Sequence, residues 1–221
     1  MKKLVILISG RGSNMQAIAQ APLGDMKLVA VLSDKPGAPG LKWAKEQGYT
    51  TEFIDPKNYA NKIAFDTALS QVIDRFSPDL IALAGFMRVL SMSFCQKYAG
   101  KLINIHPSLL PLFPGLHTHQ RALASGMKIA GCTVHFVTPE LDAGPIISQA
   151  VVPILPGDTA ESVAHRVLKA EHQLYPEAIR ALAAGKIRLN SQKNTTLCEP
   201  TVFPSIPVSY THLTLPTSDL V

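Results

Sequence analysis

Short apolar runs alternate with segments of helical spacing along the first half of the chain. The runs are rich in branched apolar residues, which predicts strands, and the segments between them repeat apolar residues with the period of a helix. Strands that alternate with helices, some of them apolar on both faces, are typical of a parallel sheet covered on both sides. We therefore predict an α/β, Rossmann-like fold with a mostly parallel central sheet. The predicted strands are 3–9, 27–33, 50–54 and 80–84, and the predicted helices begin near 15, 41 and 63.

The second half continues the alternation, and its last predicted helix is long. Asp158-Thr159-Ala160-Glu161 predicts a capping box that opens this helix, and Pro176 is expected to kink or restart it. Ser13 or Asn14 is expected to cap the first helix of the chain. A chain of 221 residues suits a single domain, which we place at 1–189. The other predicted elements are strands at 102–106, 130–137 and 146–152 and short helices at 91–98 and 120–125.

Residues 190–221 depart from this pattern. They are rich in polar and turn-forming residues and show no helical period. Within them, 208–217 resembles the translation of a transposase sequencing adapter. We interpret 190–221 as a tail outside the domain, either disordered or derived from such an adapter, with no functional role.

Composition and charge narrow the class of protein. Hydrophobic residues make up 47% of the chain, and no apolar run approaches the ~20 residues that a membrane span needs. The net charge is +5, but the basic residues are scattered, so we expect a small anionic substrate rather than nucleic acid. Cys95, Cys132 and Cys198 lie far apart, which suits reduced thiols in the cytoplasm and gives no metal-finger spacing. We predict no metal site and no membrane contact, and we expect a monomer or a homodimer.

Two polar residues interrupt the apolar strand 102–106. Because side chains alternate along a strand, Asn104 and His106 point to one side while Ile103 and Ile105 point to the other. The pair lies at the carboxyl end of its strand, where open parallel sheets bind ligands. Two interpretations stay open on these residues alone: a ligand-binding pair, or an inward pair that hydrogen-bonds to itself or to the backbone.

Three loops carry further candidates, each with a structural alternative. The glycine turn 10–14 follows the first strand and opens a helix, which suits a phosphate site or an ordinary tight turn. The loop 85–90 offers backbone groups and apolar side chains to a flat heterocycle, or it plugs the core. Asp142 precedes a short glycine turn, where a carboxylate can orient an imidazole and favour its charged form, or cap the turn. Lys62 and Asp66 are expected on a solvated helix face.

Six motifs at independent positions occur in a fixed order. They are Ser9-Gly10-Arg11-Gly12-Ser13-Asn14, Ala84-Gly85-Phe86-Met87-Arg88, Asn104-Ile105-His106-Pro107-Ser108-Leu109-Leu110-Pro111, Pro114-Gly115-Leu116-His117-Thr118-His119, His135-Phe136-Val137 and Leu141-Asp142-Ala143-Gly144-Pro145. In this order and spacing the sequence resembles the phosphoribosylglycinamide formyltransferases, the folate-dependent enzymes of purine synthesis. The resemblance covers about residues 1–190.

The resemblance implies transfer of a formyl group from 10-formyltetrahydrofolate to the amine of glycinamide ribonucleotide, on the route to IMP. Attack of an amine on a formamide-like carbon creates a negative oxygen that needs hydrogen-bond donors. The resemblance assigns this role to Asn104 and to a protonated His106, while Asp142 holds the imidazolium and relays a proton. These three residues match the catalytic trio of the family, and the chemistry needs no metal.

The resemblance also implies two binding sites. Lys62 stands where the family often has an arginine, which keeps a charge but loses a bidentate fork. Leu168 replaces a polar residue that often approaches the ribonucleotide. The implied ribonucleotide-binding residues are Gly12, Ser13, Asn14 and Glu171, and the implied folate-binding residues are Lys62, Met87, Arg88, Val89, Leu90, Asn104, Thr138, Pro139, Glu140, Leu141 and Asp142.

Three other functions compete with formyl transfer to a ribonucleotide. A formyltetrahydrofolate hydrolase shares the Asn, His and Asp constellation but carries an extra N-terminal regulatory domain, and the first strand here begins at Lys3. A methionyl-tRNA formyltransferase needs a C-terminal tRNA-binding domain, which the tail 190–221 is too short to form. A non-catalytic nucleotide-binding module has no reason to place a carboxylate against His106.

Overall fold

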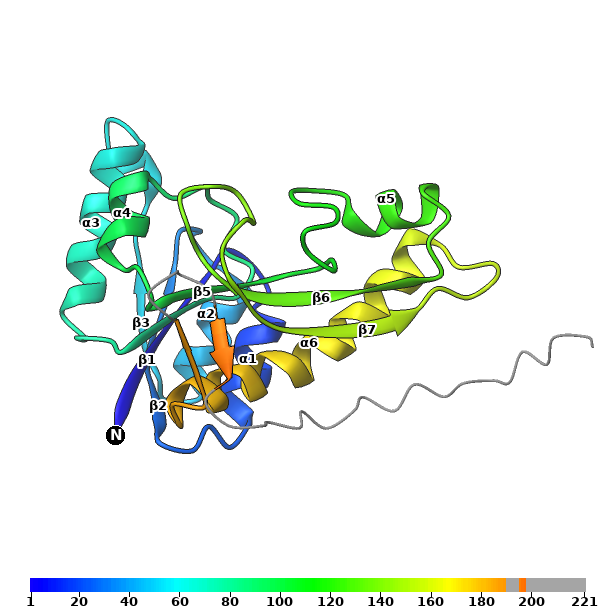
Figure 1. Ribbon diagram of the computed structural model, residues 1–221. Helices are drawn as coiled ribbons and strands as arrows, with labels where there is room; N and C mark the ends of the chain where they lie inside the picture. The colour runs from blue at the N-terminus through cyan, green and yellow to red at the C-terminus, as the bar shows by residue number, and fades with distance from the viewer. Residues whose placement is uncertain (190–194, 198–221) are drawn as a thin grey trace, which may run out of the picture.

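The described residues form a seven-stranded central sheet with helices on both faces (Figure 1). The computed structural model describes residues 1–189 and 195–197. The strand order is β3-β2-β1-β4-β5-β6-β7, so the chain starts in the interior of the sheet. The strands are β1 (Lys2–Ile8), β2 (Met26–Ser33), β3 (Thr50–Phe53), β4 (Leu80–Leu83), β5 (Leu102–His106), β6 (Ile129–Phe136) and β7 (Ile146–Pro153).

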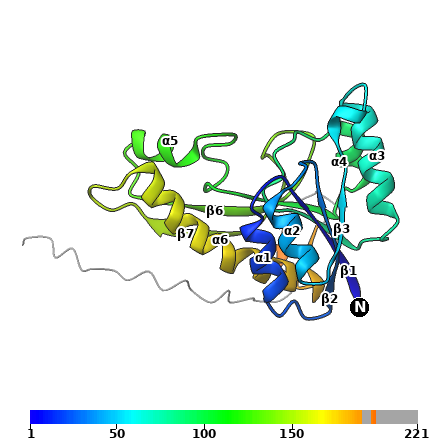
Figure 2. The same ribbon diagram turned by 180° about the vertical axis from the view of Figure 1, so that it is seen from behind.

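Two groups of helices cover the two faces of the sheet. One apolar cluster joins the sheet to α1, α2 and α6, and a second joins the opposite face to α3 and α4, as the two views from front and back show (Figure 1, Figure 2). Because both faces are covered, strands such as β1 are apolar on both sides. The predicted α/β architecture is confirmed. The helices are α1 (Ser13–Gln20), α2 (Pro39–Glu46), the 3-10 turn η1 (Pro56–Asn58), α3 (Lys62–Asp74), α4 (Met92–Lys97), α5 (Thr118–Ala124) and α6 (Ala160–Ala183).

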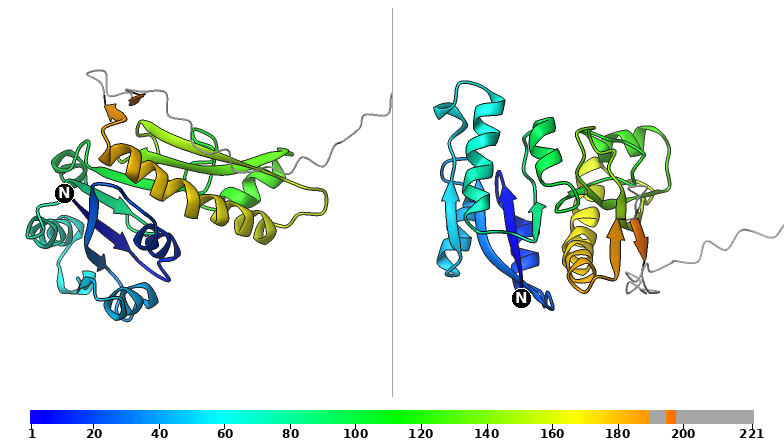
Figure 3. Two further views of the ribbon diagram at one scale, coloured as in Figure 1. Left: turned by 90° about the horizontal axis from the view of Figure 1, so that it is seen from below. Right: turned by 60° about the vertical axis from the view of Figure 1, so that its left-hand side comes forward.

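The sheet changes direction after β5. The strands from β3 to β5 run parallel, whereas β6 pairs antiparallel with β5 and β7 pairs antiparallel with β6. The two antiparallel strands extend beyond the parallel part, with α6 running along them (Figure 3). This reversal brings residues that are distant in sequence beside the end of β5.

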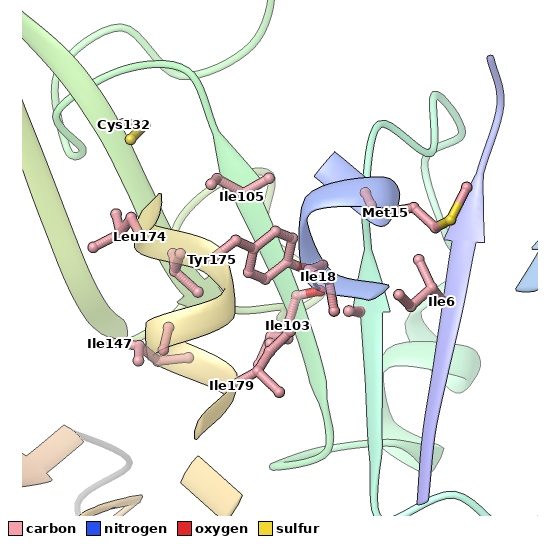
Figure 4. Close-up of a cluster of buried hydrophobic side chains, with 14 of the residues drawn as sticks. Ile6, Met15, Ile18, Ile103, Ile105, Cys132, Ile147, Leu174, Tyr175 and Ile179 are labelled. Atoms are coloured by element: carbon pink, nitrogen blue, oxygen red, sulfur yellow. Dashed lines mark hydrogen bonds between the residues drawn. The ribbon is translucent and has the colours of Figure 1, made fainter. Parts of the chain in front are cut away.

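Tyr175 fixes the long helix α6 against the strands β4 and β5. Its side chain is fully buried and points from α6 toward Ile18 and Ile103 (Figure 4). The hydroxyl lies 3.0 Å from the carbonyl oxygen of Leu83 and 3.3 Å from that of Ile103. A buried hydroxyl needs a hydrogen-bond partner, and here the partners are backbone oxygens of both strands. The helix is therefore held at the place where β4 ends.

The structure corrects two details of the long helix. The N-cap of α6 is Thr159, one residue later than predicted, because the reciprocal capping bonds join Thr159 to Ser162. The helix does not restart at Pro176 but continues through it to Ala183. A proline inside a helix removes one backbone hydrogen bond, and the buried face of α6 on both sides of Pro176 keeps the helix in place.

Two polar side chains lie elsewhere than predicted. Gly12 is the N-cap of α1, no side chain caps this helix, and Asn14 is directed to Glu171 on α6 instead. Asp66 is buried rather than solvated, because its Oδ2 atom accepts a hydrogen bond of 2.6 Å from the backbone N–H of Ser91. The helical period did not reveal that the start of α4 packs on this side of α3.

A two-stranded sheet follows α6. β8 (Ile187–Leu189) pairs antiparallel with β9 (Thr195–Leu197). Most of the tail 190–221, including the adapter-like stretch 208–217, lies outside the described residues. Within the described part of the chain, no helix combines the length and the apolarity needed to cross a membrane.

Candidate active site

The predicted polar pair lies where the parallel part of the sheet ends. Asn104 is paired with Leu83, the last residue of β4, and on its other side with His135 of β6. His106 therefore lies beyond the end of β4. The isoleucines next to these residues on β5 belong to the apolar cluster under α6, so the polar side chains face the opposite side of the sheet. The alternation predicted from the sequence is confirmed.

Asp142 reaches this pair from a distant loop. Its Oδ2 atom lies 3.3 Å from Nδ1 of His106 and accepts a hydrogen bond of 2.8 Å from the backbone N–H of Gly115. Its Oδ1 atom lies 3.8 Å from Nε2 of His135. The φ angle of Asp142 is 51°, a left-handed conformation that aspartate tolerates better than most residues. Since the side chain is only 9% exposed, the contacts with Gly115 and His106 replace water around the carboxylate.

Both ring nitrogens of His106 face oxygen atoms. Nε2 lies 3.0 Å from the carbonyl oxygen of Phe113, and Nδ1 faces the carboxylate of Asp142. Only an imidazolium has an N–H group for each of these two acceptors. The positions of these two acceptors match the two N–H groups of the protonated His106 that the family resemblance implies. A substrate oxygen that accepts from Nε2 would replace the Phe113 carbonyl, so the segment around Phe113 has to move when such a substrate binds.

His135 belongs to this cluster, although sequence reasoning assigned it no role. Its Nδ1–H donates to the carbonyl oxygen of Phe136 at 2.9 Å, because a carbonyl oxygen can only accept. In the neutral ring Nε2 is then an acceptor, and the amide nitrogen of Asn104 lies 3.3 Å from it. Burial lowers the pKa of His135, which keeps the ring neutral. The neutral ring therefore fixes the amide orientation of Asn104. The signal in the sequence that could have revealed this role was His135 itself, a polar residue within the apolar strand 130–137.

The glycine turn before α1 is tied to α6. Nδ2 of Asn14 donates to Oε2 of Glu171 at 2.7 Å, and both side chains are buried. Burial raises the pKa of Glu171, and the hydrogen bond from Asn14 opposes this shift. Gly12 has a φ angle of 70° and no side chain caps α1, so its first backbone N–H groups, beginning at Ser13, are not used by a capping side chain. This helix start suits an anion.

The loop after β4 is partly core and partly exposed. Phe86 and Leu90 are buried, whereas Met87 and Val89 are 70% and 66% exposed. Arg88 between them is half-buried. Phe86 and Leu90 therefore plug the core, whereas for the exposed Met87 and Val89 the apolar wall for a ligand stays a prediction.

Lys62 and the residues 138–141 are the other members of the predicted folate-binding set. Nζ of Lys62 donates to the carbonyl oxygen of Leu90 at 3.0 Å, so Lys62 contacts the loop after β4. The hydroxyl of Thr138 donates to the carbonyl oxygen of Glu140 at 3.2 Å, which stabilises the turn there. Pro139, Glu140 and Leu141 are exposed.

The structure thus brings the predicted residues into three groups. The first joins Asn104, His106 and Asp142 with the additional His135, the second joins Asn14 to Glu171, and the third joins Lys62 to the loop after β4. Among the described residues, no group of three or more histidine, cysteine, aspartate and glutamate side chains is arranged to hold a metal ion. The polar cluster can donate hydrogen bonds, hold an imidazolium and transfer a proton.

The part of the chain that contains these residues is similar to known proteins. Residues 2–179 match the family model described as formyl transferase. The phosphoribosylglycinamide formyltransferase of Escherichia coli is 46% identical over 190 residues, which are 85% of this chain and 90% of that protein. The trifunctional purine biosynthetic protein adenosine-3 of Bos taurus is 45% identical over 199 residues, and this match covers 89% of the chain but only 20% of that protein. The chain therefore spans about a fifth of the trifunctional relative.

Solved structures of the same kind of protein have a similar fold. Glycinamide ribonucleotide transformylase 1 from Symbiobacterium toebii superposes with a TM-score of 0.85 and 41% identity, over 90% of this chain and 95% of that chain. All the predicted site residues, from Gly12 to Glu171, lie within the region that the family model matches.

Proposed function

Because this chain belongs to the formyl transferase family, and within it to the phosphoribosylglycinamide formyltransferases, we propose that it transfers a formyl group from 10-formyltetrahydrofolate to the amine of glycinamide ribonucleotide. The products are formylglycinamide ribonucleotide and tetrahydrofolate. The observation that carries the proposal is the convergence of Asn104, His106 and Asp142, with the carboxylate 3.3 Å from the imidazole. A mere binding module has no need of such a contact.

Asn104 is the first donor to the negative oxygen. When the amine attacks, the formyl carbon becomes tetrahedral and a pair of electrons moves onto its oxygen. The amide nitrogen of Asn104 carries two N–H groups, and one of them is directed to Nε2 of His135. The second N–H group is left for the oxygen of the formyl group.

His106 is the second donor, and Asp142 keeps it charged. A charged donor forms a shorter and stronger hydrogen bond to a negative oxygen than a neutral one does. The attacking amine must lose a proton, and N10 of the folate must gain one when its bond to the formyl carbon breaks. Asp142 accepts a hydrogen bond from the backbone N–H of Gly115 and faces His106, and it relays this proton through water.

The other predicted residues divide between the two substrates. The start of α1 at Gly12 and Ser13 offers backbone N–H groups to the phosphate of the ribonucleotide. Glu171, held by Asn14, serves its glycinamide end. The pteridine ring packs on the exposed loop after β4. The folate-binding residues of this proposal are Lys62, Met87, Arg88, Val89, Leu90, Thr138, Pro139, Glu140 and Leu141.

We place the reaction in the cytoplasm. Cys95 and Cys132 are free thiols and both are buried in the core. Reduced thiols of this kind suit a reducing compartment.

The decisive experiment follows folate absorbance while each substrate is omitted in turn. With both substrates present, we expect the absorbance change of tetrahydrofolate formation, together with formylated ribonucleotide detected by mass spectrometry. With the ribonucleotide omitted, we expect no change. A change with the folate alone would identify a hydrolase, and binding of both substrates without any change would identify a binding module; either result contradicts the proposal.

A further inference from the structure

We propose that Asp34 is a positioning residue that holds the loop 85–90 against Ser9, the residue before the glycine turn 10–14. This inference rests on the proposed function, which assigns the loop to the formyl donor and the turn to the ribonucleotide. Asp34 follows directly after β2 and belongs to neither segment. No motif of the sequence singled it out.

Asp34 is a buried carboxylate with two different neighbours. It is 2% exposed, and its Oδ1 atom accepts a hydrogen bond of 2.6 Å from the hydroxyl of Ser9. Its Oδ2 atom is buried, has no hydrogen-bond partner among the described residues, and lies 3.8 Å from Nη1 of Arg88. A buried carboxylate is costly unless it is paired, so a change at Asp34 will be felt by both neighbours.

The hydroxyl of Ser9 connects Asp34 to the loop. A hydroxyl has one proton to donate and lone pairs to accept with. Because the proton of Ser9 is directed to Asp34, a lone pair faces the backbone N–H of Met87, which donates to it at 2.9 Å. The backbone N–H of Ser9 also donates to the carbonyl oxygen of Gly85 at 3.1 Å. The turn and the loop are thus joined at two points, and Asp34 orients one of them.

Arg88 is the second connection between Asp34 and the loop. Its guanidinium carbon lies 4.6 Å from the centre of the Phe65 ring, and its side chain is 32% exposed. The ring of Phe65 and the carboxylate of Asp34 together hold the guanidinium. The two oxygens of one carboxylate therefore fix two consecutive residues, Met87 through Ser9 and Arg88 directly.

This anchoring explains how the loop keeps its shape with apolar side chains exposed. Met87 and Val89 stand in solvent on either side of the held Arg88. A loop that is already in its binding conformation does not lose further conformational entropy when the ligand arrives. Loss of the anchor should therefore weaken binding of the formyl donor and leave the chemical step alone.

Two variants separate the two connections. Asp34→Asn keeps an oxygen for Ser9 but removes the charge that faces Arg88, and Ser9→Ala removes the acceptor of Met87 but keeps the charge. We expect each to raise KM for 10-formyltetrahydrofolate about tenfold, with kcat and the KM for the ribonucleotide within about twofold of wild type. Because both act on one loop, the effects in the double variant should be less than multiplicative.

Hydrogen exchange supplies a readout that does not depend on activity. The amides of 85–90 should exchange faster in Ser9→Ala and in Asp34→Asn than in the wild type. Asp158→Asn is the matched control, because it breaks a carboxylate–arginine contact of 2.8 Å with Arg166 at the start of α6. This control should change neither the exchange of 85–90 nor the KM for the donor.

The outcomes are distinguishable. Donor KM and loop exchange at wild-type values in both variants would overturn the role of Asp34. Equal increases in both KM values, matched by Asp158→Asn, would reduce Asp34 to a structural residue and would also overturn it. A wild-type chain without formyl transfer would contradict the proposed function instead, and the exchange comparison would still test the anchor.

Discussion

The cluster around His106 and the loop 85–90 are built in opposite ways. In the cluster, the side chains are polar and mostly enclosed: His106 is 6% exposed, the Asp142 side chain is 9% exposed, and Asn104 is half-buried. In the loop, Met87 and Val89 are apolar and 70% and 66% exposed. In the proposed function, the groups assigned to chemistry are thus in contact before any substrate binds, with only the Phe113 carbonyl to be displaced, whereas the wall assigned to the formyl donor is covered only when the donor arrives.

This difference separates two kinds of effect. Preorganised donors act on the transition state, so changes in the cluster should lower kcat. An exposed apolar surface contributes by being covered, so changes in the loop should raise KM. Substitutions in the two regions should therefore change different kinetic constants.

The largest effect is expected for Asp142→Asn. An amide of the same shape cannot balance the imidazolium of His106 and cannot take up a proton. We expect kcat to fall about 10²–10⁴-fold, while calorimetry shows unchanged binding of the ribonucleotide. Asp74→Asn, at an exposed carboxylate paired with Lys97, should leave kcat unchanged. Equal rates of formyl transfer in Asp142→Asn and wild type would remove the catalytic assignment.

A smaller effect is expected at His135. In His135→Leu the Asn104 amide loses the acceptor that orients it, so kcat should fall about tenfold. His135→Gln offers an amide oxygen to Asn104 and should retain most of the activity. Because burial lowers the pKa of His135, the ring is already neutral near pH 7, and the pH–rate profile of His135→Gln should match that of the wild type there. A profile displaced by the substitution would assign His135 a proton-transfer role instead.

In the loop, Met87→Ser should change binding alone. Because this side chain is 70% exposed in the free protein, its loss should cost little stability, while KM for the formyl donor rises about tenfold. Val151→Ser removes another exposed apolar side chain, on β7, and should leave both KM values unchanged. If Met87→Ser lowers kcat and keeps KM, the separation between cluster and loop is wrong.

The smallest effect concerns the pH dependence of stability. Burial raises the pKa of Glu171 above its unfolded value, so the folded chain binds more protons than the unfolded chain between these two values. This contribution to the free energy of unfolding is present at lower pH and is lost as pH rises through the raised pKa. Denaturant unfolding across the acidic range should show a shallower loss of stability with rising pH in Glu171→Gln. Parallel curves for the two proteins would contradict the prediction.

The fold was accessible from the sequence because its signals are local. Apolar runs and helical periods are properties of neighbouring residues, and strand alternation alone placed Asn104 and His106 on one side of β5. The helix ends were less accessible, since Asp158 and Thr159 are both good caps and only the bonds formed with Ser162 decide between them.

The site was less accessible because its contacts are distant in sequence. Without the family resemblance, Asp142 is an ordinary turn residue, and its approach to His106 depends on the path of a whole loop. The partnership of His135 with Asn104 depends on the register of two antiparallel strands. The role proposed for Asp34 depends on its contacts with Ser9 and Arg88, and no pattern in the sequence around Asp34 indicates these contacts.

The hydroxyl of Tyr175, set between the carbonyl oxygens of Leu83 and Ile103, also bears on how such enzymes can be recombined. A chimera assembled from two parents has to take α6, β4 and β5 from the same parent, because a mismatch there would leave the buried hydroxyl without its acceptors. The bonds of this hydroxyl do not reach the loop that follows β4, so this loop can be exchanged together with its own anchors, Ser9 and Asp34, when a new formyl donor is sought.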